Sequence, residues 1–323
     1  MTKNRAGRGH AAARRSDQSC FAVGKIKEKE GAFMDHLTGF TCQGETPEEI
    51  PLAFVRSVGK NFYDAHTDRN TMAAIARQKM LLHKDCLCKV PFCVTVEAEA
   101  LGAKVTILDD KIGPRFSGYK FTRLEQLQQL TGMDLGSGRI SEVLHGVEIL
   151  KNTGQTVVLN VEGPFTILGM LIDQMNIYKG FGKYGALIQQ VLKVIEDSIV
   201  EYMAAGIEKG AKIISYADPS GGLDIIGPRL YAQLSGNTTC SILKRIENQL
   251  DGVIVHLCGR TSSSLIKAGL CTVKPVEVGY GLTYGEMLCR LLPENKIKFL
   301  GQNCLKSTPV YMQNPVVWQL ELT

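Results

Sequence analysis

The sequence predicts an α/β protein of the (β/α)8 TIM-barrel type. Short runs rich in β-branched residues alternate with helical stretches along the chain, a pattern typical of parallel strands joined by helices. Polar residues repeatedly follow the apolar runs, as in barrels whose site lies on the carboxyl-terminal face. A doubly wound sheet would carry a glycine-rich phosphate loop after an early strand, and the sequence has none.

The composition indicates a large buried core without an export or membrane signal. The 323 residues are 44% hydrophobic and only 7% aromatic, and 33 of them are glycine, as in proteins with many tight turns. No run of about eighteen apolar residues predicts a membrane span, and no signal peptide is apparent. Ten cysteines then favour reduced thiols or metal ligands in a cytoplasmic protein over disulfides.

Residues 1–33 are predicted to form a basic, disordered arm, and residues 34–323 a single barrel domain. The first twenty residues carry five basic side chains against Asp17, a net charge of +4 out of the +5 of the whole chain. The remainder is therefore close to neutral, and neither a nucleic acid nor a membrane is expected as a partner.

The predicted elements follow one another by range. An Ala- and Met-rich helix spans 69–82 with Thr67 or Asp68 as its N-cap, and a strand beginning at Pro91 follows. Further helices are expected over 134–150, from 167, over 184–209 and over about 230–250. Apolar, β-branched runs predict strands over 156–161, 211–216, 253–258, 276–279 and 296–300, the last of the series.

Three carboxylates stand at or after predicted strand ends. Glu97 and Glu99 follow the strand from Pro91, and Asp218 follows strand 211–216. Such groups can serve as acid–base or substrate-binding residues in a pocket. For Glu97 and Glu99 the alternative is a helix start, where acidic side chains complement the helix dipole.

His256 and Cys258 close the strand that begins at Val253. Because side chains two apart on a strand share a face, an imidazole and a thiol lie side by side there. Zinc favours such a pair, and Cys304, which closes another apolar run, is the candidate third ligand. The alternative is a core histidine and two small buried thiols. His83, Cys86 and Cys88 also cluster after a helix end, but nothing nearby completes a metal site.

Five motifs in one order carry a resemblance to a known family. They are Ala65-His66-Thr67-Asp68, Pro91-Phe92-Cys93-Val94-Thr95-Val96-Glu97-Ala98-Glu99-Ala100-Leu101-Gly102, Glu162-Gly163-Pro164-Phe165-Thr166, Ala217-Asp218-Pro219 and His256-Leu257-Cys258-Gly259. Together they resemble the uroporphyrinogen decarboxylase superfamily, in its zinc-dependent branch of methylcobamide:coenzyme M and related corrinoid methyltransferases. The decarboxylases carry an arginine-rich amino-terminal segment and lack the His-x-Cys pair. Here residues 34–60 hold one arginine, Arg56, so methyl transfer is favoured.

The resemblance implies a zinc site with His256, Cys258 and a cysteine from the last strand. Cys304 stands 46 positions after Cys258; either it supplies that ligand in a shortened carboxyl-terminal part, which we favour, or the third ligand is missing. Glu277 matches in rough position an acidic residue that fills the fourth zinc position in related enzymes. The alternative for Glu277 is a carboxylate at the barrel rim.

The implied function is methyl transfer between a corrinoid protein and a thiol such as coenzyme M. The corrinoid would come from a partner protein, because Asp64-x-His66 is followed by Arg69 where the corrinoid-binding signature Asp-x-His-x-x-Gly requires glycine. One alternative is the opposite direction, from a methylated small molecule to reduced corrinoid. Another is a decarboxylase-like barrel without methyl transfer. The sequence leaves the donor, the acceptor and the direction open.

Overall fold

The computed structural model describes residues 49–109, 112–301 and 303–323. The predicted basic arm, residues 1–33, lies outside them, as do residues 34–48. Within the described ranges a seven-stranded sheet has the order β1-β4-β5-β6-β8-β9-β7. Its strands are β1 (Leu87–Val90), β4 (Thr156–Glu162), β5 (Ile213–Ala217), β6 (Ile254–Leu257), β7 (Cys271–Glu277), β8 (Phe299–Gly301) and β9 (Val316–Leu322).

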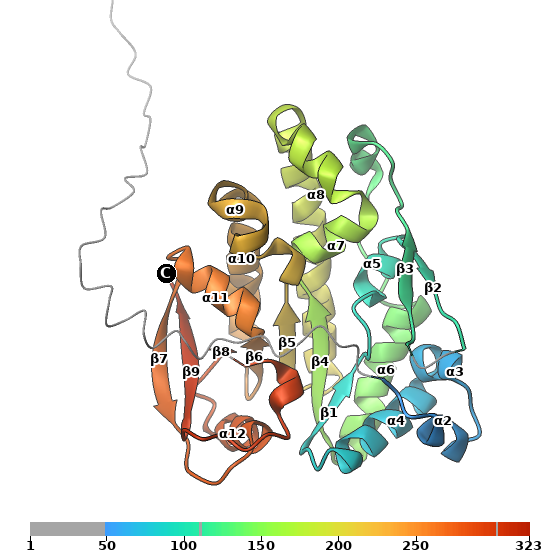
Figure 1. Ribbon diagram of the computed structural model, residues 1–323, viewed down its shortest axis with the longest axis vertical. Helices are drawn as coiled ribbons and strands as arrows, with labels where there is room; N and C mark the ends of the chain where they lie inside the picture. The colour runs from blue at the N-terminus through green and yellow to red at the C-terminus, as the bar shows by residue number, and fades with distance from the viewer. Residues whose placement is uncertain (1–48, 110–111, 302) are drawn as a thin grey trace, which may run out of the picture. The chain divides into compact units, whose positions relative to one another are not determined.

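The predicted α/β class is confirmed, because β1, β4, β5, β6 and β8 pair in parallel and helices join most of them (Figure 1). This arrangement is consistent with a (β/α)8 barrel that stays open. Among the described strands β8 pairs directly with β6, and β7 lies at the outer edge on the antiparallel β9. No pairing of described residues links β7 back to β1.

The helices alternate with these strands, and a hairpin lies outside the main sheet. The α-helices are α2 (Leu52–Ser57), α3 (Phe62–Thr67), α4 (Arg69–Leu82), α5 (Val96–Ala100), α6 (Gly138–Asn152), α7 (Pro164–Leu171), α8 (Gln174–Glu208), α9 (Leu223–Tyr231), α10 (Asn237–Ile246), α11 (Gly259–Lys267) and α12 (Tyr284–Leu291). The hairpin pairs β2 (Lys104–Thr106) with β3 (Arg115–Gly118). No helix of the described ranges is both long and apolar enough to cross a bilayer.

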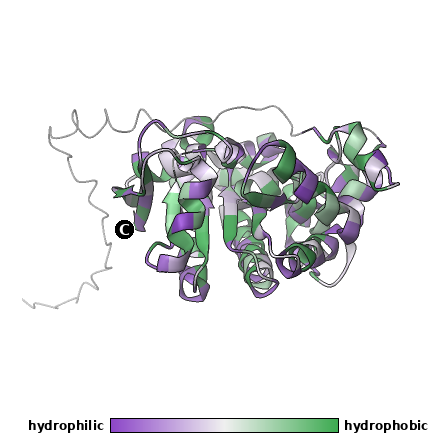
Figure 2. Ribbon diagram, turned by 90° about the horizontal axis from the view of Figure 1, so that it is seen from below, coloured by the Kyte–Doolittle hydropathy of each residue, from purple (hydrophilic) through white to green (hydrophobic). Residues whose placement is uncertain are grey.

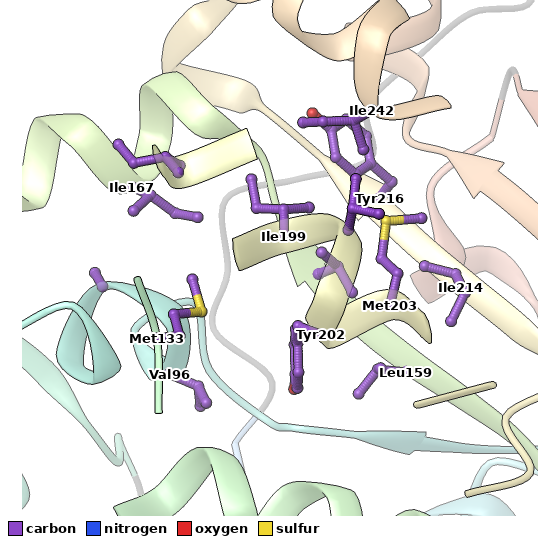
Figure 3. Close-up of a cluster of buried hydrophobic side chains, with 14 of the residues drawn as sticks. Val96, Met133, Leu159, Ile167, Ile199, Tyr202, Met203, Ile214, Tyr216 and Ile242 are labelled. Atoms are coloured by element: carbon purple, nitrogen blue, oxygen red, sulfur yellow. The ribbon is translucent and has the colours of Figure 1, made fainter. Parts of the chain in front are cut away.

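Alternation along each strand divides the buried side chains between two clusters. On β4, Val157, Leu159 and Val161 belong to the larger cluster, which helices α6, α8 and α10 help to form, whereas Val158 belongs to a smaller one. Figure 3 shows part of the larger cluster, with Tyr202 of α8 and Tyr216 of β5. In Figure 2 the strands of the sheet are mostly apolar, whereas many outward helix turns are hydrophilic. Burial of apolar area on both faces is the main stabilising contribution.

The smaller cluster is built around α12. Tyr284, Met287, Leu288 and Leu291 of this helix pack against the first residues of several strands, namely Leu87, Val158, Ile213 and Ile254, and against Leu300. In Figure 1 the helix lies at the lower end of the strands. The face that a closed barrel would turn toward its axis is therefore covered by a helix near the strand starts.

The structure confirms one predicted helix in full and differs from several other sequence predictions. Helix 69–82 is confirmed residue for residue, with the Asp68 side chain accepting from Thr71 N at 2.8 Å. The strand predicted from Pro91 is wrong: β1 ends at Val90, since proline has no N–H for the ladder, and Glu97 and Glu99 lie in α5. The predicted series of strands missed β9, and the helix predicted over 230–250 is divided into shorter helical segments.

The first prediction tests the packing of α12. We expect Leu288→Ala to lower the free energy of unfolding by about 2–5 kcal/mol, because Leu288 is 0% exposed in the smaller cluster. The control is Leu82→Ala at the end of α4, where leucine is 55% exposed and the change should stay within about 0.5 kcal/mol. Urea denaturation of both variants measures the difference. Equal effects would show that α12 is not packed as described.

Candidate functional site

Polar side chains gather at the carboxyl ends of β4, β5 and β6. The registers Asn160↔Ser215 and Ser215↔His256 place these strands level with one another, and Cys258 N donates to Tyr216 O at 3.0 Å. The residues that follow, Glu162, Asp218 and Cys258, therefore share one edge of the sheet. In barrel enzymes this is the edge that carries the chemistry.

Asp218 is the best-satisfied acid at this edge. It is 1% exposed, and its carboxylate accepts from Thr166 N and Thr166 Oγ1, both at 2.8 Å, from Ser235 Oγ at 2.6 Å and from Phe165 N at 3.3 Å. Burial raises the pKa of Asp218, while these donors oppose that shift by stabilising the charged form. The first N–H groups of α7 thus donate to an acidic side chain, as helix amino termini favour.

The close approach of β4 and β5 at this edge depends on Gly163. A Cβ atom at that position would come within 2.3 Å of Asp218 Cβ and 3.0 Å of its Cα. Gly163 N donates to Ala217 O at 2.6 Å. Only glycine fits between the two strand ends, so the Glu162-Gly163-Pro164 motif brings Glu162 close to Asp218.

Glu97 and Glu162 form a second, poorly solvated pair of acids. Glu97 is 1% exposed and accepts the Glu162 backbone N–H at 2.9 Å. Burial raises the pKa of Glu97 to about 7. Glu162 is 8% exposed, and its Oε2 has no hydrogen-bond partner among the described residues. Burial, then the charges of Glu97 and Asp218, raise the pKa of Glu162 well above its usual value.

Glu162 is a site residue that our sequence reasoning did not single out, although it belongs to one of the motifs. Val158, Asn160 and Glu162 are two residues apart along β4, so they share the face that points away from the larger cluster. This spacing is the signal that could have identified Glu162. Glu99, in contrast, is used structurally. It forms an ion pair with Arg139 of α6, whose Nη2 also donates to Thr95 Oγ1 at 2.8 Å and whose Nη1 donates to Cys93 Sγ at 3.4 Å.

His256 is completely buried and held by one tyrosine. Its Nε2 lies 2.9 Å from the Tyr284 hydroxyl, and the two rings meet edge to face at 5.7 Å. Its Nδ1 has no partner among the described residues. Burial lowers the pKa of His256 to about 4, so the ring is neutral at pH 7. With the ring hydrogen on Nε2 and donated to Tyr284, the lone pair of Nδ1 is available to a ligand.

Cys258 caps helix α11 and is linked to the acids through Thr261. Its Sγ lies 3.1 Å from Thr261 Oγ1 and 3.5 Å from Thr261 N. The same hydroxyl oxygen accepts from Asp218 N at 2.9 Å, so its hydrogen is available to the sulfur. The thiol therefore sits at a helix amino terminus, where a negative charge on sulfur is favoured.

The predicted zinc ligands are not brought together as one set. Among the residues that the structure describes, no three His, Cys, Asp or Glu side chains are placed to hold a metal ion. Cys304 precedes the turn Leu305–Ser307 and lies close enough to raise the pKa of the Tyr284 hydroxyl, although burial is the larger cause. Glu277 is exposed at the end of the edge strand β7, paired with Val316. The predicted strand ends at Leu257, so His256 of β6 and Cys258 at the start of α11 are the two candidate donors, and no third donor joins them among the described residues.

The chain is similar in sequence to a known protein family and to known methyltransferases. Residues 41–281, three quarters of the chain, match the uroporphyrinogen decarboxylase (URO-D) family. The chain belongs to that family. It is 26% identical over 213 residues to the methylcobamide:CoM methyltransferase MtbA of Methanosarcina acetivorans, covering 64% of this chain and 62% of that protein. It is 24% identical over 249 residues to MtaA of Methanosarcina barkeri, covering 73% and 72%.

A solved structure shares the fold of this URO-D family chain. A methyltransferase from Methanosarcina mazei aligns with a TM-score of 0.57 at 23% identity, over 72% of this chain and 71% of that one. The predicted resemblance to this superfamily and its methyltransferase branch is therefore confirmed. The match to the MtbA relative spans less than two thirds of that protein's length.

The second prediction concerns the pH dependence of stability that the buried acid Glu97 causes. Between pH 4.5 and about 7 the unfolded chain has released this proton and the folded chain has kept it, so raising the pH through that window lowers the free energy of unfolding, by up to about 3 kcal/mol. Glu97→Gln should remove this part of the slope, because glutamine can still accept the Glu162 N–H. Denaturation at pH 4.5 and pH 7.5 measures it. Glu208→Gln on α8, where the side chain is not buried, is the control, and equal slopes in both variants would contradict the assignment.

Proposed function

We propose that this URO-D family chain is a methyltransferase that moves a methyl group between a corrinoid protein and a small thiol such as coenzyme M. The observation that carries the proposal is the shared edge of β4, β5 and β6, where a neutral histidine, a capping thiol and a carboxyl group of pKa about 7 are gathered. The methyltransferase names of the relatives support it.

The chain's own residues account for the proton that the transfer releases. The thiol sulfur would form a bond to the methyl carbon while the carbon–cobalt bond of the partner's corrinoid breaks. The electron pair of the broken bond would stay on cobalt, and the thiol would lose its proton. Glu97, with a pKa of about 7, can accept that proton at neutral pH, which is the condition for an efficient general base. Four donors favour the charged form of Asp218, although burial raises its pKa.

One observation favours the opposite direction as a second candidate. Glu162 Oε2 has no hydrogen-bond partner among the described residues, and burial together with two neighbouring acids raises the pKa of Glu162 well above its usual value, which favours its protonated form. A protonated carboxyl group can donate to the leaving group of a methylated substrate while reduced corrinoid takes the methyl group. Running the assay in both directions separates the two candidates.

Zinc remains part of the proposal, with His256, Cys258 and Cys304 as ligands and Glu277 as the candidate fourth. Support comes from Nδ1 of His256, which has no partner among the described residues, and from the Cys258 thiol two residues further along the chain, just past the end of β6. The Tyr284 hydroxyl on Nε2 has the role of the outer partner that orients a metal-bound imidazole. When bound, zinc would stabilise a substrate thiolate. Cys304 would have to approach, since the described residues do not form a three-donor set.

The third prediction tests the activity. Incubation of the purified chain with a methylated corrinoid protein and coenzyme M should yield the methylated thiol and reduced corrinoid, followed by absorbance. Cys258→Ser should lower the rate by about 100-fold or more, because loss of even an outer partner of a metal ligand has an effect of this order. Cys240→Ala, a thiol of α10 in the larger cluster, is the control and should retain the rate. A chain inactive in both directions would reject methyl transfer.

The fourth prediction concerns Tyr284 and needs no activity. If its hydroxyl orients the His256 ring, Tyr284→Phe should weaken zinc binding by about 10–100-fold in competition with a coloured chelator. Tyr202→Phe is the matched control, because Tyr202 is equally buried but its hydroxyl has no partner among the described residues. Tighter binding in Tyr284→Phe would instead show that the hydroxyl competes with the metal for Nε2. Absence of zinc in the wild-type chain would reject the ligand set.

A further inference from the structure

Two cysteines far apart in the sequence meet where α12 contacts the start of β1. Cys86 directly precedes β1, Cys289 lies in α12, and their sulfur atoms are 3.5 Å apart. Both side chains are partly exposed. In Figure 1 α12 and the start of β1 both lie at the lower end of the sheet, away from the carboxyl strand ends. Neither cysteine belongs to the site proposed above.

The contact between the two segments is built closely. Gly285 stands one turn before Cys289 on the same face of α12, and a Cβ atom there would come within 3.0 Å of both Cys86 Sγ and Asp85 Oδ1. A residue with a side chain at this position would therefore push the helix away from Cys86. The glycine allows the helix to approach until the two sulfur atoms touch.

Asp85 fixes the backbone that carries Cys86. Its Oδ1 accepts from Cys86 N at 2.8 Å, and its Oδ2 accepts from Thr308 Oγ1 at 2.5 Å and pairs with Lys89 Nζ at 2.9 Å. Lys89 also donates to Leu305 O at 2.9 Å. These contacts tie the start of β1 to the segment that follows β8, so the thiol is held toward α12 by groups on two sides.

The environments of the two thiols differ. The hydrogen bond between the two thiols is the largest cause of the lowered pKa of Cys289, while burial and the nearby charge of Asp85 oppose this shift. The same bond, together with burial, raises the pKa of Cys86. The charged groups around the pair are Asp85 on the β1 side and Glu286 on α12. Cys289 is thus the thiol that ionises first, and the thiolate is the reactive form.

We propose that Cys86 and Cys289 are a redox-active dithiol, which low-molecular-weight disulfides oxidise to an intramolecular disulfide joining α12 to β1. The Cys289 thiolate attacks one sulfur of the small disulfide, forms a mixed disulfide and releases one small thiolate. The Cys86 sulfur then attacks the Cys289 sulfur, releases the second small thiolate and gives up its proton to it. In balance, two protein thiols and one small disulfide yield one protein disulfide and two small thiols.

The expected disulfide requires only a small movement. The sulfur atoms must close from 3.5 Å to about 2.05 Å. The cross-link would join residues 203 positions apart, which removes much chain entropy from the unfolded state. Oxidation should therefore raise the Tm of the chain and slow amide exchange in α12.

In the test, the full chain is equilibrated with mixtures of oxidised and reduced glutathione. The remaining thiols are then blocked, and the protein is digested for peptide mapping. We expect the Cys86–Cys289 linked peptide as the main cross-link and a higher Tm, both reversed by dithiothreitol. Cys86→Ser should show no such Tm rise and should carry glutathione on Cys289. Cys289→Ser should carry less glutathione on Cys86, because Cys289 is the more acidic thiol.

Two controls keep the test decisive. Cys304→Ser, which alters a thiol outside the pair, should form the cross-link as the wild type does. The conservative Cys→Ser changes are confirmed as folded by their Tm under reducing conditions. Glutathione on separate cysteines without a cross-link, or a cross-link between other cysteines as the main product, would overturn the proposal. Because the readouts are cross-linking and stability, failure here leaves the methyl-transfer proposal untouched.

Discussion

The parallel register of β4, β5 and β6 is the constraint on which the rest of the structure depends. Because side chains alternate along a strand, this register turns Val158, Ile213 and Ile254 toward α12, and His256, two residues after Ile254, toward the Tyr284 hydroxyl of the same helix. A slip by one residue on any strand would turn these side chains into the larger apolar cluster. The apolar packing near the strand starts therefore fixes which polar groups reach the carboxyl edge.

At that edge, hydrogen-bond donors rather than burial distinguish the acids. Glu97, Glu162 and Asp218 are all almost fully buried, so desolvation raises the pKa of each. Asp218 has four donors, Glu97 accepts one N–H from Glu162, and Glu162 Oε2 has none among the described residues. Since donors stabilise the charged form, the three acids differ in proton affinity in that order. Such a graded set places groups that hold a proton beside groups that release it.

Local patterns in the sequence predicted what depends on local chemistry. The helix Arg69–Leu82 and its Asp68 cap follow from propensity and capping, and the strand that presents His256 follows from three β-branched residues. The structure departs where long-range contacts decide. The antiparallel pairing of β7 with β9, which leaves Glu277 exposed on an edge strand, leaves no local signal, and neither does the Tyr284 hydroxyl on His256. The missing partner of Glu162 could not be predicted, because it depends on where every neighbouring donor lies.

Helix α12 carries both Tyr284 of the site and Cys289 of the cysteine pair. The energies of its contacts show whether apolar packing or the hydrogen bond to His256 determines the position of the helix. Burial of Met287, Leu288 and Leu291 contributes on the order of 5–9 kcal/mol, whereas a single hydrogen bond such as that between Tyr284 and His256 contributes about 1 kcal/mol. The docked helix therefore positions the hydroxyl, and the hydroxyl does not hold the helix. Tyr284 and Cys289 lie about 7–8 Å apart along the helix axis. A movement of α12 at Cys289 would therefore be a movement of the element that carries the Tyr284 hydroxyl, which lies 2.9 Å from His256 Nε2.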